Sequence, residues 1–330
     1  MEWKLRNAPA AGHPTLGILS ITGAVFLLSL SDALVKLAGE RMGLGQLVLI
    51  RSAFAAILIA GAVAATSSLR RMRPVRPGWV LLRSLCLTGM WLCYYAALPA
   101  MSFALAAACY YTAPMWMAVL SWLVLKEPLG LRRWSAVVIG LAGVLIAINP
   151  GLGTVSPVVV LPLAAAFLYA LAGIITWSRC RGESPLAMAQ ALNLTLMAGG
   201  GLAILALALI DPGPGAGFVL AVWPPLGLED WLLMAALGVL LAVITVSVAL
   251  AYRLGPPDII GVFDNTYLLF AAVWGALIFA DIPSLREGLG MALIATGALL
   301  ASRAPPGKDC GKEKAGALGG HRPRPNAGRG

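Results

Sequence analysis

The sequence predicts an all-α integral membrane protein with ten transmembrane helices, arranged as two inverted five-helix repeats. Three observations support this fold class: the composition, a series of ten apolar stretches and an internal duplication. Of the 330 residues, 60% are hydrophobic and only 12% are charged, and the mean hydropathy is +0.87. A soluble domain carries about 25% charged residues, so the composition argues against a soluble globular protein.

Ten apolar stretches are long enough to cross a bilayer, which requires about 20 predominantly apolar residues. Backbone groups find no water partners in lipid, so each stretch is expected to be a helix. A β-barrel would show short segments of alternating hydrophobicity, and the sequence has none. The first stretch contains Asp32 and Lys36 and lacks a small-residue cleavage pattern, so we interpret it as a helix and not as a signal peptide. The stretches are 16–38, 44–66, 79–98, 101–124, 131–149, 157–178, 185–208, 230–252, 258–280 and 284–302.

An internal repeat relates the fourth and fifth stretches to the ninth and tenth. Residues 112–147 align without a gap on residues 266–301, 154 positions later, with nine identities in 36 positions. The acid in the connecting turn recurs as Glu127 and Asp281. An odd number of spans in each half makes the second half enter the membrane from the opposite side, which is the inverted-repeat architecture of many transporters. The predicted units are a lead at 1–15, repeats at 16–149 and 157–302, and a disordered basic tail at 303–330.

The positive charges are distributed asymmetrically between the two sets of loops. The net charge is +10, and most loop cations fall on the side that carries both termini, including those from Arg70 to Arg76 and those after residue 302. By the positive-inside rule, both termini are cytoplasmic. We expect the protein to lie in a bacterial inner membrane, with the lipid bilayer and a small molecule as its partners and without a nucleic-acid partner.

Three segments resemble the EamA-type members of the drug/metabolite transporter superfamily. They are SDALVK at 31–36 together with Arg51, CYYTAPMW at 109–116, and LKEPLGLRRWSAVVIGLAGVLI at 125–146. The first of these, with Arg51, is similar to bacterial carriers of S-adenosylmethionine and riboflavin. The resemblance implies a ten-helix secondary transporter. The second repeat departs from the first, with Asp264, Asn265 and Leu268 in place of Tyr110, Tyr111 and Pro114, on the helix expected to line the site.

Charged side chains inside the first two spans are candidates for substrate binding or gating. A charge at mid-span costs roughly 2.5–3.5 kcal/mol, so it should face a cavity or a partner. Asp32 and Lys36 share one helix face, and Asp32 and Arg51 lie at similar depths, about 9 and 10 Å from the outer end. We expect Arg51 or Lys36 to hold an anionic substrate group, with Asp32 as a switchable partner. A structural ion pair between the two spans is the alternative.

Polar residues of the second half form another candidate group. Asp264 and Asn265 lie about 9–10 Å from the cytoplasmic end of the ninth stretch, and Asn193 lies at a similar depth in the seventh. A buried carboxyl group in this position is a candidate for proton coupling or for binding a substrate cation. The alternative is a hydrogen bond between helices, worth about 0.6 kcal/mol on average.

Aromatic residues concentrate at mid-depth in the third and fourth spans, away from the interfacial belts where Trp and Tyr usually gather. They are Trp91, Tyr94, Tyr95, Tyr110, Tyr111 and Trp116. Such a group could stack a planar ring or a cation, although ordinary packing is the alternative for each residue. Tyr111 and Trp116 are the preferred pocket residues, because Pro114 between them permits a kink.

The sequence predicts a secondary transporter of a small polar or zwitterionic metabolite, which works by alternating access and is coupled to an ion or to exchange. No Walker-type loop and no cluster with metal-ligand spacing is present, so we expect no ATP hydrolysis, no metal, no cofactor and no enzymatic activity. A lipid or lipid-linked sugar flippase of the same fold is the alternative, and an enzyme acting on lipid-linked substrates is a third. Gly140, Gly143, Gly290 and Gly297 could form a homodimer face or pack helices within one chain.

Overall fold

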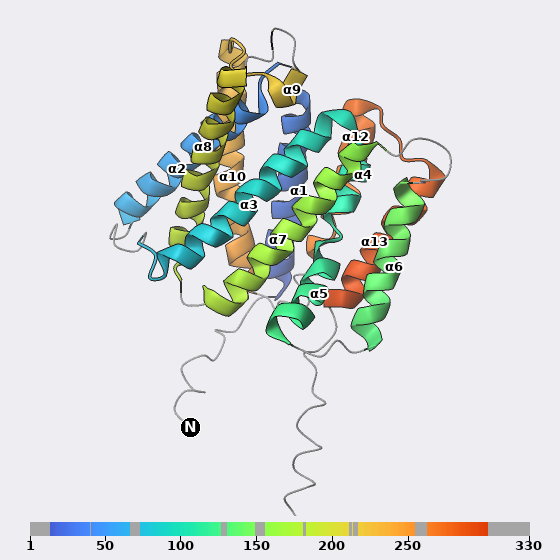
Figure 1. Cartoon of the computed structure of the whole chain (residues 1–330). Coiled ribbons are helices and arrows are strands. Elements are labelled where there is room, and N and C mark those ends of the chain that lie inside the picture. Colours follow the sequence, from blue (N-terminus) through green and yellow to red (C-terminus); the bar gives the residue numbers. More distant parts are fainter. Residues whose placement is uncertain are drawn as a thin grey trace, which may run out of the picture.

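The computed structural model describes residues 14–39, 41–66, 73–126, 131–148, 156–180, 183–210, 213, 217–254 and 263–302 (Figure 1). Every regular element within these ranges is a helix. The first six α-helices are α1 (Pro14–Ala38), α2 (Leu44–Thr66), α3 (Pro77–Ala97), α4 (Phe103–Tyr110), α5 (Ala113–Leu125) and α6 (Leu131–Ile148). The others are α7 (Val160–Arg179), α8 (Pro185–Ile210), α9 (Gly217–Leu220), α10 (Leu228–Leu254), α12 (Tyr267–Phe279) and α13 (Leu285–Ser302), with short 3₁₀ turns η3 (Leu98–Ala100) and η4 (Pro157–Val159).

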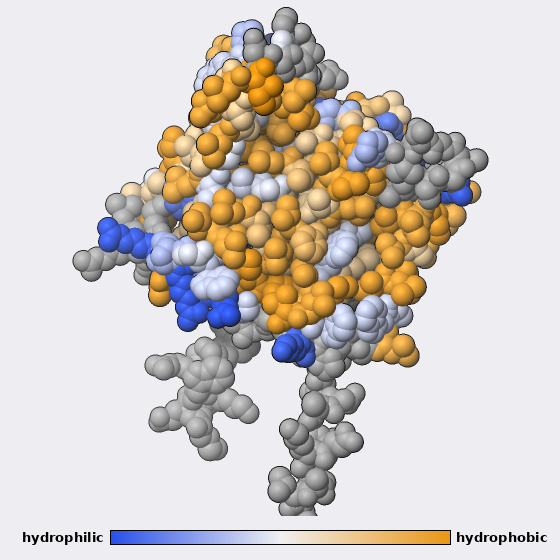
Figure 2. All heavy atoms as spheres, in the orientation of Figure 1, coloured by the Kyte–Doolittle hydropathy of each residue, from blue (hydrophilic) through white to orange (hydrophobic). Residues whose placement is uncertain are grey.

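Six helical segments are long and apolar enough to cross a membrane, and 134–147 and 267–279 are shorter apolar helices. The six are 15–38, 44–65, 77–100, 103–124, 157–176 and 186–210. Large apolar side chains are exposed along them, and Figure 2 shows an apolar surface that gives way to hydrophilic side chains at its lower edge. The prediction of an all-helical membrane protein is therefore confirmed. The number of ten spans stays a prediction, and part of the ninth stretch lies outside the described residues, as do the lead up to residue 13 and the tail from residue 303.

The fourth apolar stretch is interrupted in its middle. Helix α4 ends at Tyr110 and α5 begins at Ala113, with Pro114 in its first turn. Proline fits that position because the first N–H groups of a helix lack partners within the helix. The Thr112 hydroxyl group donates a 2.7 Å hydrogen bond to the Cys109 carbonyl oxygen, which satisfies one acceptor at the end of α4. The kink that Pro114 was expected to permit is thus a break between two helices.

The same local features recur 154 residues later. The Thr266 hydroxyl group donates a 2.6 Å hydrogen bond to the Phe263 carbonyl oxygen, and α12 begins at the next residue, as α5 does after Thr112. Helices α5 and α12 both end on a left-handed residue, Lys126 with φ 56° and Ala280 with φ 53°. The bounds of α6 and α13 also differ by 154, since 131 + 154 = 285 and 148 + 154 = 302.

Helices from the two halves of the chain pack in pairs. The main pairs are α2 with α8, α6 with α13, α3 with α7 and α1 with α10. At the α6–α13 contact, a Cβ added to Gly143 would lie 2.7 Å from the Gly290 carbonyl oxygen, and one added to Gly297 would lie 2.8 Å from the Ala136 carbonyl oxygen. Small residues therefore let these two backbones touch. In the structure the glycines of α6 and α13 pack helices within one chain.

The two ends of the molecule are distinguished by the direction of the helices. Helices α1 and α3 begin, and α7 and α13 finish, at the lower end of Figure 1, whereas α1 finishes at the upper end, near α9. The first and last described helices thus have their free ends on the same side. Helices α1, α2, α3, α4, α7, α8, α10 and α12 surround the site described next.

Candidate functional site

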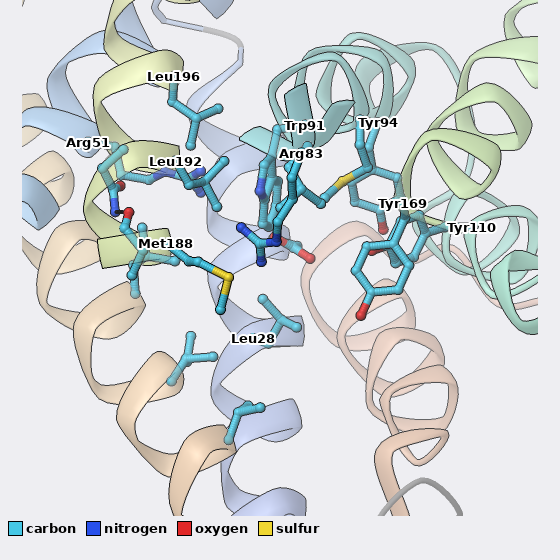
Figure 3. A pocket seen from close by; sticks show the side chains of 18 of the residues that line it. Leu28, Arg51, Arg83, Trp91, Tyr94, Tyr110, Tyr169, Met188, Leu192 and Leu196 are labelled. Atoms are coloured by element: carbon cyan, nitrogen blue, oxygen red, sulfur yellow. Dashed lines mark hydrogen bonds between the residues drawn. The ribbon is translucent and has the colours of Figure 1, made fainter. Parts of the chain in front are cut away.

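A cavity of about 380 Å³ lies between the helices of the two halves (Figure 3). Its wall is mostly apolar, with aromatic side chains from α3, α4, α7 and α12. Cavities of about 300–1,000 Å³ with a few polar groups are typical of small-molecule sites. The polar and charged residues that line this one are Asp32, Arg51, Arg83 and Asn193, besides tyrosine hydroxyl groups.

Helical periodicity brings the lining residues to the cavity. On α3 they are Arg83, Leu87, Met90, Trp91 and Tyr94, at spacings of four, three, one and three residues, which place them on one helix face. On α8, Met188, Leu192 and Leu196 follow one another at four-residue steps, with Asn193 beside them. Figure 3 shows the labelled α8 side chains facing those of α3. One face of α3 from the first half and one face of α8 from the second half therefore line the cavity.

Asp32 and Arg51 are connected through a tyrosine. The Tyr95 hydroxyl group donates a 3.3 Å hydrogen bond to Asp32 Oδ1, and Arg51 Nη1 donates to the Tyr95 hydroxyl oxygen. The Tyr267 hydroxyl group donates a 2.6 Å hydrogen bond to Asp32 Oδ2, and it also lies 3.2 Å from the Tyr94 hydroxyl group. The resulting chain of polar groups joins α2, α3, α1 and α12. The two residues that sequence reasoning placed at one depth thus belong to one network.

Arg51 retains unused donors although it is fully enclosed. Only 1% of the residue is exposed, and its guanidinium carbon lies 4.9 Å from the centre of the Trp91 ring and 5.0 Å from that of Tyr95. Its Nε and Nη2 atoms are buried without a hydrogen-bond partner. A buried donor without a partner costs about 1–3 kcal/mol. Since Arg51 lines the cavity, an acceptor on a bound molecule would remove this cost.

Lys36 is directed away from Asp32, toward the upper end of the molecule. Its ammonium group donates hydrogen bonds to the Met101 carbonyl oxygen at 2.9 Å and to Asp281 Oδ2 at 3.4 Å, and it lies 4.6 Å from the centre of the Phe279 ring. It therefore fastens the end of α1 to two loops, η3–α4 and α12–α13. Asp32 and Arg51 therefore belong to one hydrogen-bond network, and Lys36 is bound elsewhere. Lys36 is not among the residues that line the cavity.

Asn193 is among the residues that line the cavity, and one of the two polar atoms of its amide group makes a hydrogen bond within the protein. Its Nδ2 atom donates a 3.0 Å hydrogen bond to the Ala189 carbonyl oxygen within α8. Its Oδ1 atom is buried without a partner. The side chain can therefore accept one hydrogen bond from a molecule in the cavity.

The other expected residues lie behind or outside this wall. Tyr111 stacks on Tyr267 with ring centres 5.1 Å apart, and its hydroxyl group donates a 3.4 Å hydrogen bond to the backbone carbonyl oxygen of Asp264. Asp264 is the last helical residue before the turn at 265–266 that precedes α12, and Asn265 lies in that turn. Trp116 is 36% exposed and meets Phe167 edge to face. Tyr111, Asp264, Asn265 and Trp116 are not among the residues that line the cavity.

Three charged or aromatic lining residues were not anticipated as site residues: Arg83, Tyr169 and Tyr267. Tyr110 lies 5.6 Å from Tyr169 and 5.2 Å from Tyr94, measured between ring centres. Six tyrosines whose side chains the structure describes form one connected group, namely Tyr94, Tyr95, Tyr110, Tyr111, Tyr169 and Tyr267. The signal was in the sequence, because Arg83 is a cation inside a predicted span and both tyrosines lie at mid-span.

Comparison with known proteins places this architecture among characterised relatives. Residues 15–149 match the model of the EamA-like transporter family. A riboflavin transporter of Vibrio cholerae serotype O1 is 27% identical over 286 residues, 86% of this chain and 91% of the relative. A riboflavin transporter of Rhizobium johnstonii is 29% identical over 193 residues, 58% of this chain and 59% of the relative. A crystal structure of a protein that is 20% identical gives a TM-score of 0.57 over 88% of this chain and 98% of that chain, and the two share a fold.

Proposed function

We propose that the chain is an EamA-type member of the drug/metabolite transporter superfamily and that it carries a planar, polar heteroaromatic metabolite of the riboflavin class across the membrane. It is a transporter of small metabolites and not an enzyme. The observation that carries the proposal is the cavity, whose lining residues include five aromatic residues together with Arg51 and Asn193, and both of these have buried polar atoms without a partner among the described residues.

The aromatic wall supports a planar substrate. Trp91, Tyr94, Tyr110, Tyr169 and Tyr267 all line the cavity, and they come from α3, α4, α7 and α12. Offset stacking between rings contributes about 0.5–1.5 kcal/mol beyond the burial of area. Two relatives with riboflavin as their named substrate agree with a site of this kind. The volume of about 380 Å³ falls within the range of small-molecule sites.

The polar atoms support a substrate with acceptors and a donor along one edge. The isoalloxazine ring of a flavin carries carbonyl oxygens and an imide N–H at one end. Arg51 offers Nε and Nη2 as donors, and Asn193 offers Oδ1 as an acceptor, all without a partner inside the protein. A ring bound between them would satisfy these buried atoms. An analogue that lacks the matching groups would leave the atoms unpaired, so the site would bind it more weakly.

We infer further that the halves form two inverted five-helix repeats that move against each other. In this proposal α1, α2, α3 and α6 of the first half correspond to α7, α8, α10 and α13 of the second half. Exchanging the halves then turns the pair α3–α7 into the pair α10–α1, and it leaves the pairs α2–α8 and α6–α13 unchanged. All four pairs are in contact in the structure. Repeats of this type enclose a midplane site, and rocking of one against the other exposes it alternately.

Alternating access requires contacts that close each end in turn. At the upper end, Lys36 joins α1 to Met101 and Asp281. At the lower end, the buried Glu183 carboxylate accepts hydrogen bonds from the backbone N–H groups of Val75 at 2.8 Å and Arg76 at 2.6 Å. In this proposal one set of contacts breaks while the other persists. Asp264 and Asp32 are the candidates for coupling the movement to an ion. We propose that the lower end of the molecule and both termini lie in the cytoplasm of a bacterium.

Uptake by the full-length purified protein in liposomes tests the proposal. Liposomes preloaded with riboflavin should accumulate labelled external riboflavin by exchange, and an excess of unlabelled riboflavin outside should suppress the signal. Arg51→Ala should abolish accumulation, whereas Arg41→Ala, at the exposed upper surface, should not. Absence of exchange by the folded wild type would refute a riboflavin-class substrate. Scrambling of labelled lipid without flavin exchange would support the flippase alternative.

A further inference from the structure

Arg83 is a cation in the wall of the cavity, and it has no anionic partner among the residues that the structure describes. It projects from α3, and Figure 3 shows it among the lining side chains. Its Nε atom donates a 2.8 Å hydrogen bond to the Thr176 hydroxyl oxygen on α7. Its Nη1 atom is buried and makes no hydrogen bond. We infer that Arg83 is a subsite for an anionic group, a carboxylate or a phosphate monoester, on the transported molecule; the inference rests on the proposed transport function.

The charges around the cavity leave Arg83 uncompensated. Three ionisable side chains with a formal charge line the cavity, namely Asp32, Arg51 and Arg83. The Asp32 carboxylate is occupied by the hydroxyl groups of Tyr95 and Tyr267 and is linked to Arg51 through Tyr95. No carboxylate oxygen within the described part of the chain lies within 4.0 Å of the Arg83 guanidinium group. The cavity therefore carries one more cation than anion.

The acid nearest to this end of the molecule is already engaged. Glu183 follows α7 and accepts hydrogen bonds from the backbone N–H groups of Val75 and Arg76, just before α3 begins. The Glu183 carboxylate keeps its negative charge, but these hydrogen bonds hold it at the start of α3, and it forms no ion pair within 4.0 Å of Arg83. Because a charge inside a membrane is costly unless it faces a partner or a water-filled cavity, the unpaired Arg83 indicates a ligand of opposite charge.

The position of Arg83 along α3 sets the shape of the ligand. Arg83 precedes Trp91 by eight residues, or about 12 Å along the helix axis. Trp91 is the ring against which Arg51 stacks. The backbone of Arg83 thus lies about two helical turns from that of Trp91, toward the start of α3. A molecule with its ring beside Trp91 and an anionic group on a short polar chain would reach Arg83, whereas an uncharged ring alone would not.

Arginines near a helix end often extend toward lipid head groups instead. Two contacts argue against this for Arg83. Its Nε atom is held by Thr176, whose hydroxyl group is itself fixed by a 2.7 Å hydrogen bond to the Ala172 carbonyl oxygen. Its terminal Nη1 atom is buried, whereas a group that contacts head groups is solvated. The side chain is directed inward, so the anion should come from the substrate and not from a lipid.

The subsite is tested by comparing the binding of riboflavin with that of riboflavin 5′-phosphate, which differ only in the anionic group. Binding to the full-length protein in neutral detergent is followed by quenching of tryptophan fluorescence. We expect Arg83→Gln to weaken binding of the phosphate at least about tenfold, since a hydrogen bond to a charged group is lost, and to change riboflavin binding less than about threefold. Arg83→Lys should restore part of the preference. Arg73→Gln, an exposed charge at the same end, should change neither ligand.

A second measurement distinguishes failure of the anion subsite at Arg83 from failure of the riboflavin-class substrate. If neither flavin binds, the riboflavin-class substrate is refuted, and phenyl phosphate then tests the subsite alone, with phenol as its neutral control. Phenyl phosphate should raise the thermal unfolding temperature of the wild type and of Arg83→Lys but not of Arg83→Gln. Equal responses of wild type and Arg83→Gln to both phosphates would overturn the subsite. An Arg83-dependent response to phosphatidylglycerol, without one to the soluble anions, would overturn it in favour of a lipid head group.

Discussion

The hydroxyl group of Tyr267 donates a 2.6 Å hydrogen bond to Asp32 Oδ2, and it thereby joins α12 to α1 across 235 residues of chain. The same two helices meet where Trp274 Nε1 donates a 3.2 Å hydrogen bond to the Ser29 hydroxyl oxygen. Since Asp32 also connects to Arg51 through Tyr95, the position of α12 is linked to the Arg51 guanidinium group, which we propose to bind the substrate. A substrate that changes the environment of Arg51 can therefore bias the contact between the halves.

Tyr267→Phe should slow transport at least about tenfold and lower the unfolding temperature by a few degrees. The substitution leaves the stacked ring in place but removes a donor to a charged acceptor, an interaction worth about 1.5–3 kcal/mol. Flavin exchange in liposomes and thermal unfolding in detergent measure the two effects. Tyr94→Phe removes only the contact between two hydroxyl groups, so its effect should be smaller. Wild-type exchange by Tyr267→Phe would show that this bond has no part in transport.

Arg51→Lys should raise the KM for flavin about tenfold or more without unfolding the protein. A lysine keeps a positive charge near Tyr95 and Asp32, but it lacks the Nε and Nη2 donors and the planar group that stacks on Trp91. Initial rates of exchange at varied flavin concentration give the KM. The matched change Arg41→Lys affects a surface cation that pairs with Glu229 at 3.6 Å and should leave the KM unchanged. An unaltered KM in Arg51→Lys would assign Arg51 a purely structural role.

The sequence predicted the helical membrane fold, and the reasons are physical. Composition and length are enough to identify apolar helices, because lipid leaves the backbone no other way to satisfy its polar groups. Counting residues from the helix ends placed Asp32 and Arg51 at one depth, and the structure brings them into one network. The 154-residue register of the repeat is also visible in the bounds of α6 and α13.

The partners of individual side chains could not be predicted in the same way. Lys36 lies one turn beyond Asp32, and its long side chain reaches Asp281 on a loop that is 245 residues distant in sequence. Helix spacing alone predicts that Lys36 pairs with Asp32 on the same helix face, whereas in the folded chain it pairs with Asp281 on the loop. Tyr267 has no tyrosine counterpart in the first repeat, where Ala113 occupies its position, so comparison of the repeats did not indicate its contact with Asp32.

Asp264→Asn should abolish flavin accumulation driven by an imposed ion gradient while the protein stays folded. Tyr111 contacts the backbone carbonyl oxygen of Asp264, so the substitution leaves that hydrogen bond intact and removes only the charge of the side chain. Accumulation under a pH gradient, together with gradient-free exchange, distinguishes loss of coupling from loss of binding. Glu229→Gln neutralises an exposed acid and serves as the control. Undiminished accumulation by Asp264→Asn would exclude Asp264 from the coupling mechanism.

Gly143→Ala should destabilise the protein by about 1–3 kcal/mol, because a methyl group at this position enters the α6–α13 contact. The added Cβ would lie 2.7 Å from the Gly290 carbonyl oxygen and 2.9 Å from the backbone nitrogen of Ile294, and neither backbone atom can move without separating the helices. Thermal unfolding in detergent, followed by reaction of a thiol-specific dye with the buried Cys109, measures the change.

Gly61→Ala is the matched control for this prediction. Gly61 also lies inside a helix, α2, but nothing lies within 4 Å of a Cβ built on it. The methyl group therefore meets no obstacle there, and the higher helix propensity of alanine should leave stability unchanged or raise it by up to about 1 kcal/mol. If Gly143→Ala unfolds at the same temperature as Gly61→Ala, the close approach of α6 and α13 does not depend on the absence of a side chain at residue 143.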